Sequence, residues 1–352
     1  MFIRPDPVEA WSSNDGAVVV FAGPGDDKGD AVTVDSSGNV YTTGYFGDTV
    51  DFDPGSGTAN LTSNGDYDVF VSKLDSSGNY VWAKSFGGSG SDFGNDVAVD
   101  SSGNVYTIGF FSDTVDFDPG SGTANLTSNG DYDVFVSKLD SSGNYVWAKS
   151  FGGPEQDQGY GVAVDSSGNV YITGSYSTAL GVTVDFDPGL GTANLSSYGQ
   201  RGRDTYILKL DSSGNYVWVK SFEKTGDSGS TTDTGFDVTV DSSGNVYTIG
   251  YFEGGLDFDP GAGTAELAST PSSPGSTSTF TDVFVSKLDS SGNYVWAKSF
   301  GGTARGTGTA IAVDSSGNVY TTGYFAETFD FDPGPGTANH SAPENFRKDV
   351  FV

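Results

Sequence analysis

The chain has 352 residues, with 52 Gly, 13 Pro, no Cys, a single His and a formal net charge of −30. The absence of Cys excludes disulfides and thiolate metal sites. With a single His, a zinc site built from several histidines is excluded as well. No apolar run approaches the roughly 18–20 residues of a membrane-spanning helix. The negative charge disfavours nucleic acids and anionic lipid surfaces as partners, whereas hard cations such as Ca²⁺ stay compatible with it.

One unit recurs along almost the whole chain. Its most regular phrase is Val-Asp-Ser-Ser-Gly-Asn-Val-Tyr, whose Asp stands at Asp35, Asp100, Asp165, Asp241 and Asp314. In the second unit, residues rich in β-branched and aromatic side chains predict strands over 96–100, 105–110, 133–139 and 145–151. The segments 101–104 and 141–144 are Ser-Ser-Gly-Asn turns that join these strands in pairs.

These elements predict an all-β fold, a five-bladed β-propeller of four-stranded antiparallel blades. In chain order we expect an N-terminal extension over 1–16, a strand over 17–22, and blades over about 30–86, 95–151, 160–222, 236–300 and 309–352. The last blade ends in its third strand, and the segment 17–22 aligns with a fourth strand, so we expect this segment to complete the last blade and close the ring. A fragment of a longer array is the alternative.

The repeated phrases also resemble a known family. Val97–Gly109, followed by Asp133–Gly153, is similar to the bacterial β-propeller repeats called SBBP repeats, and the similarity extends over roughly 17–352. The resemblance implies a secreted or cell-surface bacterial protein, although residues 1–20 contain no signal peptide. It implies no shared catalytic residues.

The phrase Asp-Phe-Asp-Pro-Gly occurs once in each unit. In an extended segment its two Asp side chains lie on one side, where they and loop carbonyls could hold Ca²⁺, the only cofactor suggested. A turn with the Phe packed between blades competes with this interpretation. The blade-to-blade loops add further oxygen ligands, namely Asp92, Asn95 and Asp96, and in other copies Asp26, Asp27, Asp30 and Asp157. The predicted metal ligands are Asp51, Asp53, Asp116, Asp118, Asp185, Asp187, Asp257, Asp259, Asp330 and Asp332.

Aromatic side chains divide into packing and binding candidates. We expect the fourth-strand residues Trp82, Trp147, Trp218 and Trp296 to pack between blades. Tyr67, Tyr132 and Tyr198 precede third strands, at the end where loop lengths vary, and are the candidates for ligand stacking. We expect His340 to be an incidental surface residue.

Near-identical blades present equivalent environments, whereas catalysis normally needs one asymmetric constellation. We therefore expect no enzyme, but a lectin-like adhesion module that binds a glycan or cell-surface protein through repeated weak sites on an acidic loop face. The alternative is a surface-layer or filament subunit that binds copies of itself by strand addition. A glycoside hydrolase that uses paired carboxylates is a remote third hypothesis.

Overall fold

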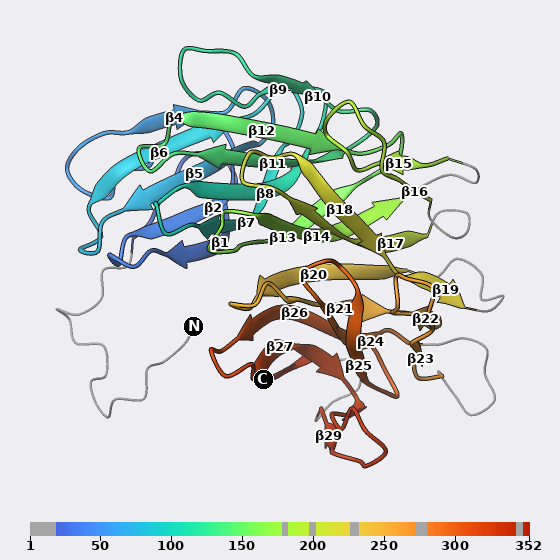
Figure 1. The fold of residues 1–352 in the computed structure, drawn as a ribbon. Helices are drawn as coiled ribbons and strands as arrows, with labels where there is room; N and C mark the ends of the chain where they lie inside the picture. The colour runs from blue at the N-terminus through green and yellow to red at the C-terminus, as the bar shows by residue number, and fades with distance from the viewer. Residues whose placement is uncertain (1–18, 178–181, 197–201, 226–231, 272–279, 343–347) are drawn as a thin grey trace.

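The computed structural model describes residues 19–177, 182–196, 202–225, 232–271, 280–342 and 348–352 (Figure 1). Antiparallel sheets of one type follow one another in chain order, as predicted. The first three have the strand orders β1 (Lys28–Val34), β2 (Val40–Phe46), β5 (Asp68–Leu74), β6 (Tyr80–Phe86); β7 (Phe93–Val99), β8 (Val105–Phe111), β11 (Asp133–Leu139), β12 (Tyr145–Phe151); and β13 (Gln158–Val164), β14 (Val170–Ser177), β17 (Arg203–Leu210), β18 (Tyr216–Ser221).

The last two sheets vary this plan. The fourth contains β20 (Asp233–Val240), β21 (Val246–Phe252), β24 (Asp282–Leu288) and β25 (Tyr294–Gly302), and it continues into β28 (Thr328–Asp330) and β29 (Asn339–Ser341). The fifth has three strands, β26 (Gly306–Val313), β27 (Val319–Ala326) and β30 (Lys348–Phe351). Residues 1–16, the expected N-terminal extension, lie outside the described residues.

Each unit also contains a short hairpin that the four-strand prediction lacks. It lies between the second and third strands, and its first strand ends at the first Asp of Asp-Phe-Asp-Pro-Gly. Besides β28 and β29, these hairpins are β3 (Thr49–Asp51) with β4 (Asn60–Thr62), β9 (Thr114–Asp116) with β10 (Asn125–Thr127), β15 (Val184–Asp185) with β16 (Asn194–Leu195), and β22 (Gly255–Asp257) with β23 (Glu266–Ala268), the last extended by β19 (Glu223–Thr225). Three-residue strands are too short to give a visible alternation of apolar and polar residues.

The predicted third and fourth strands of the second unit coincide with β11 and β12. The first strand, predicted over 96–100, begins earlier, at Phe93, because it continues past a β-bulge between Gly94 and Asp96. Such a bulge admits one extra residue and shifts the alternation of side chains that the prediction relied on.

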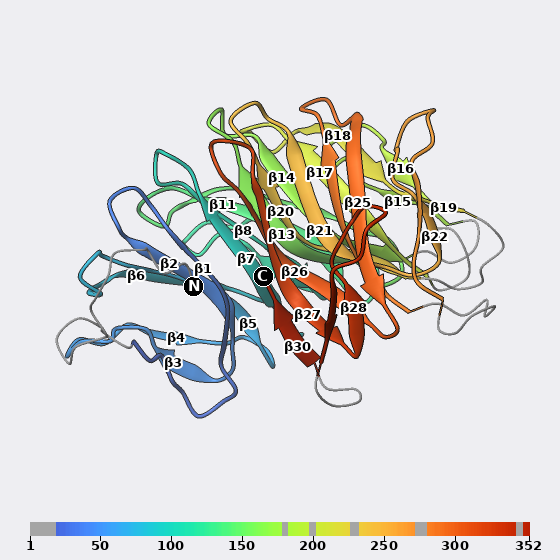
Figure 2. The same cartoon turned by 90° about the horizontal axis from the view of Figure 1, so that it is seen from below.

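The sheets pack face to face around an arc, with the first strand of each sheet towards the middle (Figures 1 and 2). β7 packs against β1, β13 against β7, β20 against β13 and β26 against β20. Val97 in β7 is 4% exposed because the first sheet covers it. Trp82 packs on the turn of the following unit, where its Nε1 donates to the Ser141 carbonyl at 3.2 Å. The inter-sheet role predicted for the tryptophans is thus confirmed for Trp82, and Trp147 and Trp218 make the same bond.

Among the described residues, no sheet covers the two outermost faces of this arc. Val32 has the position of Val97 but is 67% exposed, and on the last sheet Tyr320 is 49% exposed although its counterpart Tyr41 is fully buried. At the N-terminal end, Ala22 pairs with Asp51, and the ring of Phe21 lies 5.1 Å from that of Phe52. The arrangement is consistent with a β-propeller. The placement of 17–22 as the fourth strand of the last blade stays a prediction.

Candidate functional site

The Ser-Ser-Gly-Asn turns form one end of every sheet and are held by their own side chains. Asp75 Oδ1 accepts the backbone amides of Ser77 and Asn79 at 2.8 and 2.9 Å, and its Oδ2 accepts Asn79 Nδ2 at 2.9 Å. The hydrogen bonds from Asn79 lower the pKa of Asp75. Gly78 takes a φ of 81°, which side chains other than glycine rarely adopt. This end is built for turn geometry, so the search for a site moves to the opposite end.

The Asp-Phe-Asp-Pro-Gly segments lie at that opposite end and share one geometry. Asp51 Oδ1 accepts the amides of Asp53 and Ala59 at 3.0 and 2.8 Å, and Asp53 Oδ1 accepts the amide of Gly55 at 2.7 Å. The bond from Ala59 is the main cause of the lowered pKa of Asp51. Phe52 is 1% exposed and packs on Phe21, Phe46 and Phe70.

The other four copies repeat these hydrogen bonds. Among the described residues, no group of three or more His, Asp or Glu side chains could hold a metal ion. The bonding therefore shows what Asp51 and Asp53 do for the hairpin, and calcium binding there stays a prediction.

The structure brings two of the predicted ligand tyrosines into one aromatic strip, defined as Tyr45, Tyr67, Phe93, Phe110 and Tyr132. The ring of Tyr45 lies 5.1 Å from those of both Tyr67 and Phe93, and the ring of Phe110 lies 4.9 Å from Phe93 and 5.2 Å from Tyr132. All five side chains are half-buried. The strip therefore crosses from the first sheet to the second at the loop end. Tyr198 lies outside the described residues.

Sequence reasoning missed Tyr45, Phe93 and Phe110, because each looks like an ordinary strand residue. The available signal was a difference between copies. In the third unit Gln158 and Ser175 stand where the second has Phe93 and Phe110, so these aromatics belong only to part of the repeat.

Between the fourth and fifth sheets, a pocket occupies the place that the aromatic strip has between the first and second. Its volume is about 470 Å³, and Tyr251, Arg305, Thr307, Tyr324 and Lys348 are among its lining residues. Thr307 has the position of Phe93, so a smaller side chain leaves the space open. Lys348 Nζ lies 3.8 Å from the Tyr324 ring centre. Burial acts to raise the pKa of Tyr324, but Thr307 and Lys348 outweigh it and lower that pKa.

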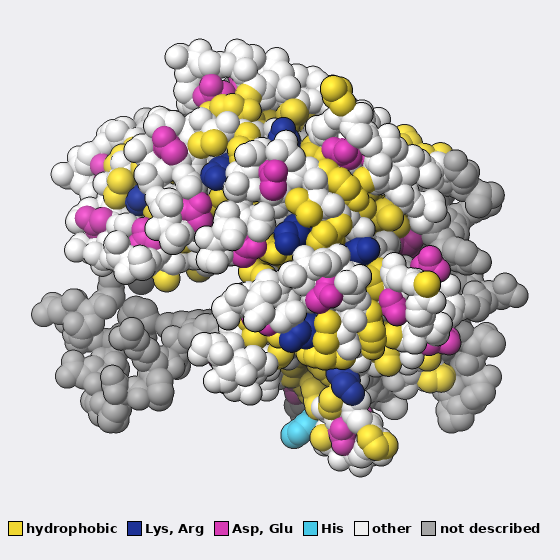
Figure 3. Space-filling view, in the orientation of Figure 1, with side chains coloured by type: hydrophobic (Ala, Val, Ile, Leu, Met, Phe, Trp, Pro, Cys, Tyr) yellow, Lys and Arg dark blue, Asp and Glu magenta, His cyan; other side chains and the backbone are white. Residues whose placement is uncertain are grey.

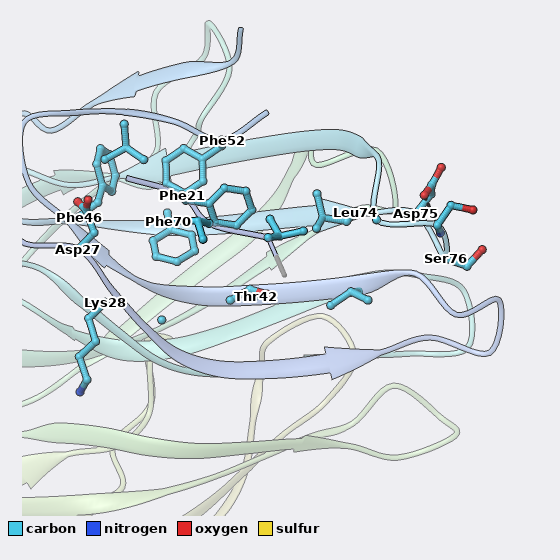
Figure 4. A pocket seen from close by; sticks show the side chains of 17 residues that line it. Phe21, Asp27, Lys28, Thr42, Phe46, Phe52, Phe70, Leu74, Asp75 and Ser76 are labelled. Atoms are coloured by element: carbon cyan, nitrogen blue, oxygen red, sulfur yellow. Dashed lines mark hydrogen bonds between the residues drawn. The ribbon is translucent and has the colours of Figure 1, made fainter. Parts of the chain in front are cut away.

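A larger groove of about 790 Å³ lies along the uncovered face of the first sheet (Figure 4). The rings of Phe21, Phe46, Phe52 and Phe70 gather at one end of it, and the turn at Asp75 and Ser76 lies at the other. In the second sheet the equivalent face is covered by Trp82 and Phe86 of the preceding sheet. The groove is therefore a packing face that has no neighbouring sheet among the described residues.

Surface charge does not single out one acidic patch on the face seen in Figure 3, where Asp and Glu are dispersed among uncharged residues. His340 is exposed on β29, as expected for a surface residue, with its ring 5.8 Å from that of Phe331. The described residues include no helix long and apolar enough to cross a membrane.

Comparison with known proteins identifies the repeat. Residues 81–109, 146–175 and 295–324 match the family model described as SBBP, beta-propeller repeat. Each matched segment runs from a fourth strand into the second strand of the next unit.

Similar curated proteins are much longer than this chain. An uncharacterized WD repeat-containing protein of Acanthamoeba polyphaga mimivirus is 26% identical over 59% of this chain, and the regulatory protein FlaEY of Caulobacter vibrioides is 31% identical over 39% of it. The alignments cover 15% of each relative. Among solved structures, a protein of unknown function from Bacteroides caccae has a TM-score of 0.36 and 11% identity, over 80% of this chain and 68% of that one.

Proposed function

Because this chain carries beta-propeller repeats of the SBBP family, we propose that it is a non-catalytic extracellular binding module that holds a glycan or another surface ligand on the aromatic strip. The observation that supports this function is the continuity of five half-buried rings across two sheets. Tyrosine combines a large apolar face with a polar tip, which suits a ligand with alternating apolar and hydroxyl surfaces. A sugar ring has this character.

The scaffold beneath the strip favours binding rather than catalysis. The first four units repeat the same strands, turns and hairpin. The strip departs from this repetition through its apolar rings, and not through acidic or basic side chains. A rigid repeated scaffold with variable residues at its loop end is a common arrangement for recognition. Calcium binding at the Asp-Phe-Asp-Pro-Gly segments is a separate prediction, on which the strip does not depend, and it competes with the calcium sites argued below.

A glycan array followed by calorimetry with the best hit tests this function. We expect Tyr67→Ala and Tyr132→Ala each to weaken binding about five- to thirtyfold, since one stacked ring contributes about 1–2 kcal/mol, by analogy with base stacking on aromatics. Tyr320→Ala, which removes an exposed ring on the last sheet, is the matched control and should leave affinity unchanged. Equal losses for all three, or hydrolysis of the glycan by the wild type, would reject the proposal.

The finer architecture is also proposed: five blades, closed by the strand at 17–22. Support comes from the environment of Phe21, which packs on Phe52 as Phe86 packs on Phe117 one unit later. Phe21 therefore contacts the first sheet as a fourth-strand residue of the preceding blade would. The fifth sheet has three strands, so its edge strand β30 can accept a fourth. Val350 and Val352 at that edge are 75% and 97% exposed.

Self-assembly is the second candidate, favoured by the two uncovered faces at Val32 and Tyr320, which could meet between copies of the chain. Register places Val19 opposite Val352 if the strand at 17–22 pairs with β30. The double variant Val19→Cys/Val352→Cys distinguishes the two models, because the chain has no other cysteine and a disulfide needs Cα atoms within about 7 Å. A cross-linked monomer supports closure, and a disulfide-linked ladder supports assembly.

A further inference from the structure

Two carboxylates are buried together where the first sheet meets the second, and the arrangement recurs where the second meets the third. Asp68 begins β5 and Asp92 directly precedes β7, and Asp133 and Asp157 have the same positions one unit later. All four are at most 1% exposed. The two acids lie side by side, because the Asp92 amide donates to the carbonyl of Tyr67 at 2.8 Å, as that of Asp157 does to Tyr132 at 2.9 Å. The Asp68 carboxylate lies against Gly87, and the next amide, that of Gly88, donates to Asp92 Oδ2 at 2.8 Å. Burial raises the pKa of Asp92 to about 7, and the charge of Asp68 adds to this increase.

The hydrogen bonds around these carboxylates leave one oxygen of each pair without a partner. Asp68 Oδ2 accepts the backbone and side-chain nitrogens of Asn64 at 3.1 and 3.2 Å, but the buried Oδ1 has no hydrogen-bond partner. Asp133 repeats this pattern, with Oδ1 again unpartnered. An ionised oxygen buried without a partner is costly, because it has lost its water.

The third junction shows what compensates such a pair. Asp204 and Asp233 have the register positions of Asp68 and Asp92, and here a lysine joins them. Lys224 Nζ lies 3.1 Å from Asp204 Oδ1 and 3.6 Å from Asp233 Oδ2, with all three side chains at most 3% exposed. In the repeat, the position of Lys224 is the second residue after a recurring Phe, here Phe222. The same position holds Gly88, after Phe86, and Gly153, after Phe151. A positive charge thus occupies the third junction, and glycine stands at that place in the other two.

We propose that a Ca²⁺ ion binds at each of the first two junctions, between Asp68 and Asp92 and between Asp133 and Asp157, where it takes the role that the Lys224 ammonium has at the third. Carboxylate oxygens are hard ligands that suit Ca²⁺, which completes its coordination with backbone carbonyls and water. Each junction needs only two carboxylates for this, so the proposal is compatible with the described residues, which contain no group of three or more His, Asp or Glu side chains that could hold a metal ion. The proposal is independent of the ligand strip.

The number of sites follows from the same comparison. At the fourth junction Asp282 also has a buried, unpartnered Oδ1, but Gly306 stands at the position of Asp92, so only one carboxylate is present. We therefore expect two ions at the four junctions between the described sheets. Binding at the Asp-Phe-Asp-Pro-Gly segments would instead give five.

Calorimetric titration of the EDTA-treated, dialysed chain with CaCl₂ in about 0.15 M NaCl tests the proposal, because salt screens weak surface binding. We expect two ions per chain and a melting temperature about 5–10 °C higher at a hundredfold excess over Kd. Asp68→Asn and Asp133→Asn keep the shape of the side chain, so each should remove one ion. Asp53→Asn, in the first hairpin, is the matched control and should leave two.

Removing the internal cation supplies the converse experiment. Lys224→Met keeps the apolar stem but removes the ammonium that lies between Asp204 and Asp233, so this variant should bind a third ion. No calcium heat together with a melting temperature unmoved by EDTA would overturn the proposal, as would loss of an ion in Asp53→Asn but not in Asp68→Asn. A folded Lys224→Met chain that still binds two ions would overturn the equivalence between the junctions.

Discussion

Replacing one buried tryptophan tests whether contacts between sheets hold the fold together. Trp147 is 8% exposed, its ring lies 6.2 Å from that of Tyr106, and its Nε1 donates to the Ser212 carbonyl of the next unit at 3.3 Å. The indole also lies against the turn glycine Gly214, where a Cβ would come within 3.1 Å of it. Trp147→Ala removes this contact while leaving the strand itself intact.

The size of the effect follows from burial. Truncating a buried tryptophan to alanine costs about 3–5 kcal/mol, and the lost hydrogen bond adds about 1 kcal/mol. Trp296 offers an internal comparison, because it packs on Tyr247 as Trp147 packs on Tyr106, at a ring distance of 6.2 Å, but is only partly buried. No following turn covers it among the described residues, so Trp296→Ala should cost about 2 kcal/mol.

Urea unfolding followed by near-ultraviolet circular dichroism measures both losses. For a chain of this size, a loss of about 4–6 kcal/mol lowers the melting temperature by about 5–8 °C. Trp147→Ala should therefore unfold at a clearly lower urea concentration than Trp296→Ala, with similar m-values. Equal losses in the two variants would refute the reasoning, since they would place the stabilisation within each sheet and not between sheets.

Three further predictions concern turns, hairpins and a buried acid. Gly103 has a φ of 80°, so Gly103→Ala should cost about 1–2 kcal/mol in urea unfolding, and an unchanged midpoint would contradict the turn geometry. Asp116→Ala should cost about 1–2 kcal/mol by freeing two hairpin amides, whereas Asp116→Asn, which keeps the acceptor, should cost less. Burial, and then the charge of Asp237, raises the pKa of Asp96. Protonation of Asp96 therefore stabilises the folded chain. This contribution is complete below the unfolded pKa of about 4 and is lost as the pH rises through the folded pKa. Asp96→Asn should therefore reduce the difference between the free energies of unfolding measured at pH 5 and at pH 8. An equal difference in wild type and variant would exclude Asp96 as its source.

Local pattern was enough for the strands and turns. The alternation in 133–139 and the Ser-Ser-Gly-Asn turn that follows located β11 and β12 to the residue, because short-range sterics and turn chemistry decide such elements. The hairpin strands Thr49–Asp51 and Asn60–Thr62 escaped prediction, since a three-residue strand contains too little pattern and is fixed by Phe52 packing in the core.

The candidate site was only partly visible in the sequence. Tyr67 and Tyr132 were singled out by their place before third strands, but the neighbours that join them, Tyr45, Phe93 and Phe110, look like strand residues until the sheets are stacked. The Asp-Phe-Asp-Pro-Gly acids stood out by repetition, yet their carboxylates turned out to be engaged by hairpin amides.

The sequence by itself determined the repeat, the all-β class and the chemistry that a chain with no cysteine and one histidine lacks. These properties depend on composition and on contacts between residues close in the chain. Only the tertiary structure decided which carboxylates are stripped of water. Asp68 and Asp92 are separated by a strand, a turn and a second strand, and Lys224 meets Asp204 and Asp233 through the packing of sheets. Burial and proximity of charges arise from that packing, and no local pattern contains them.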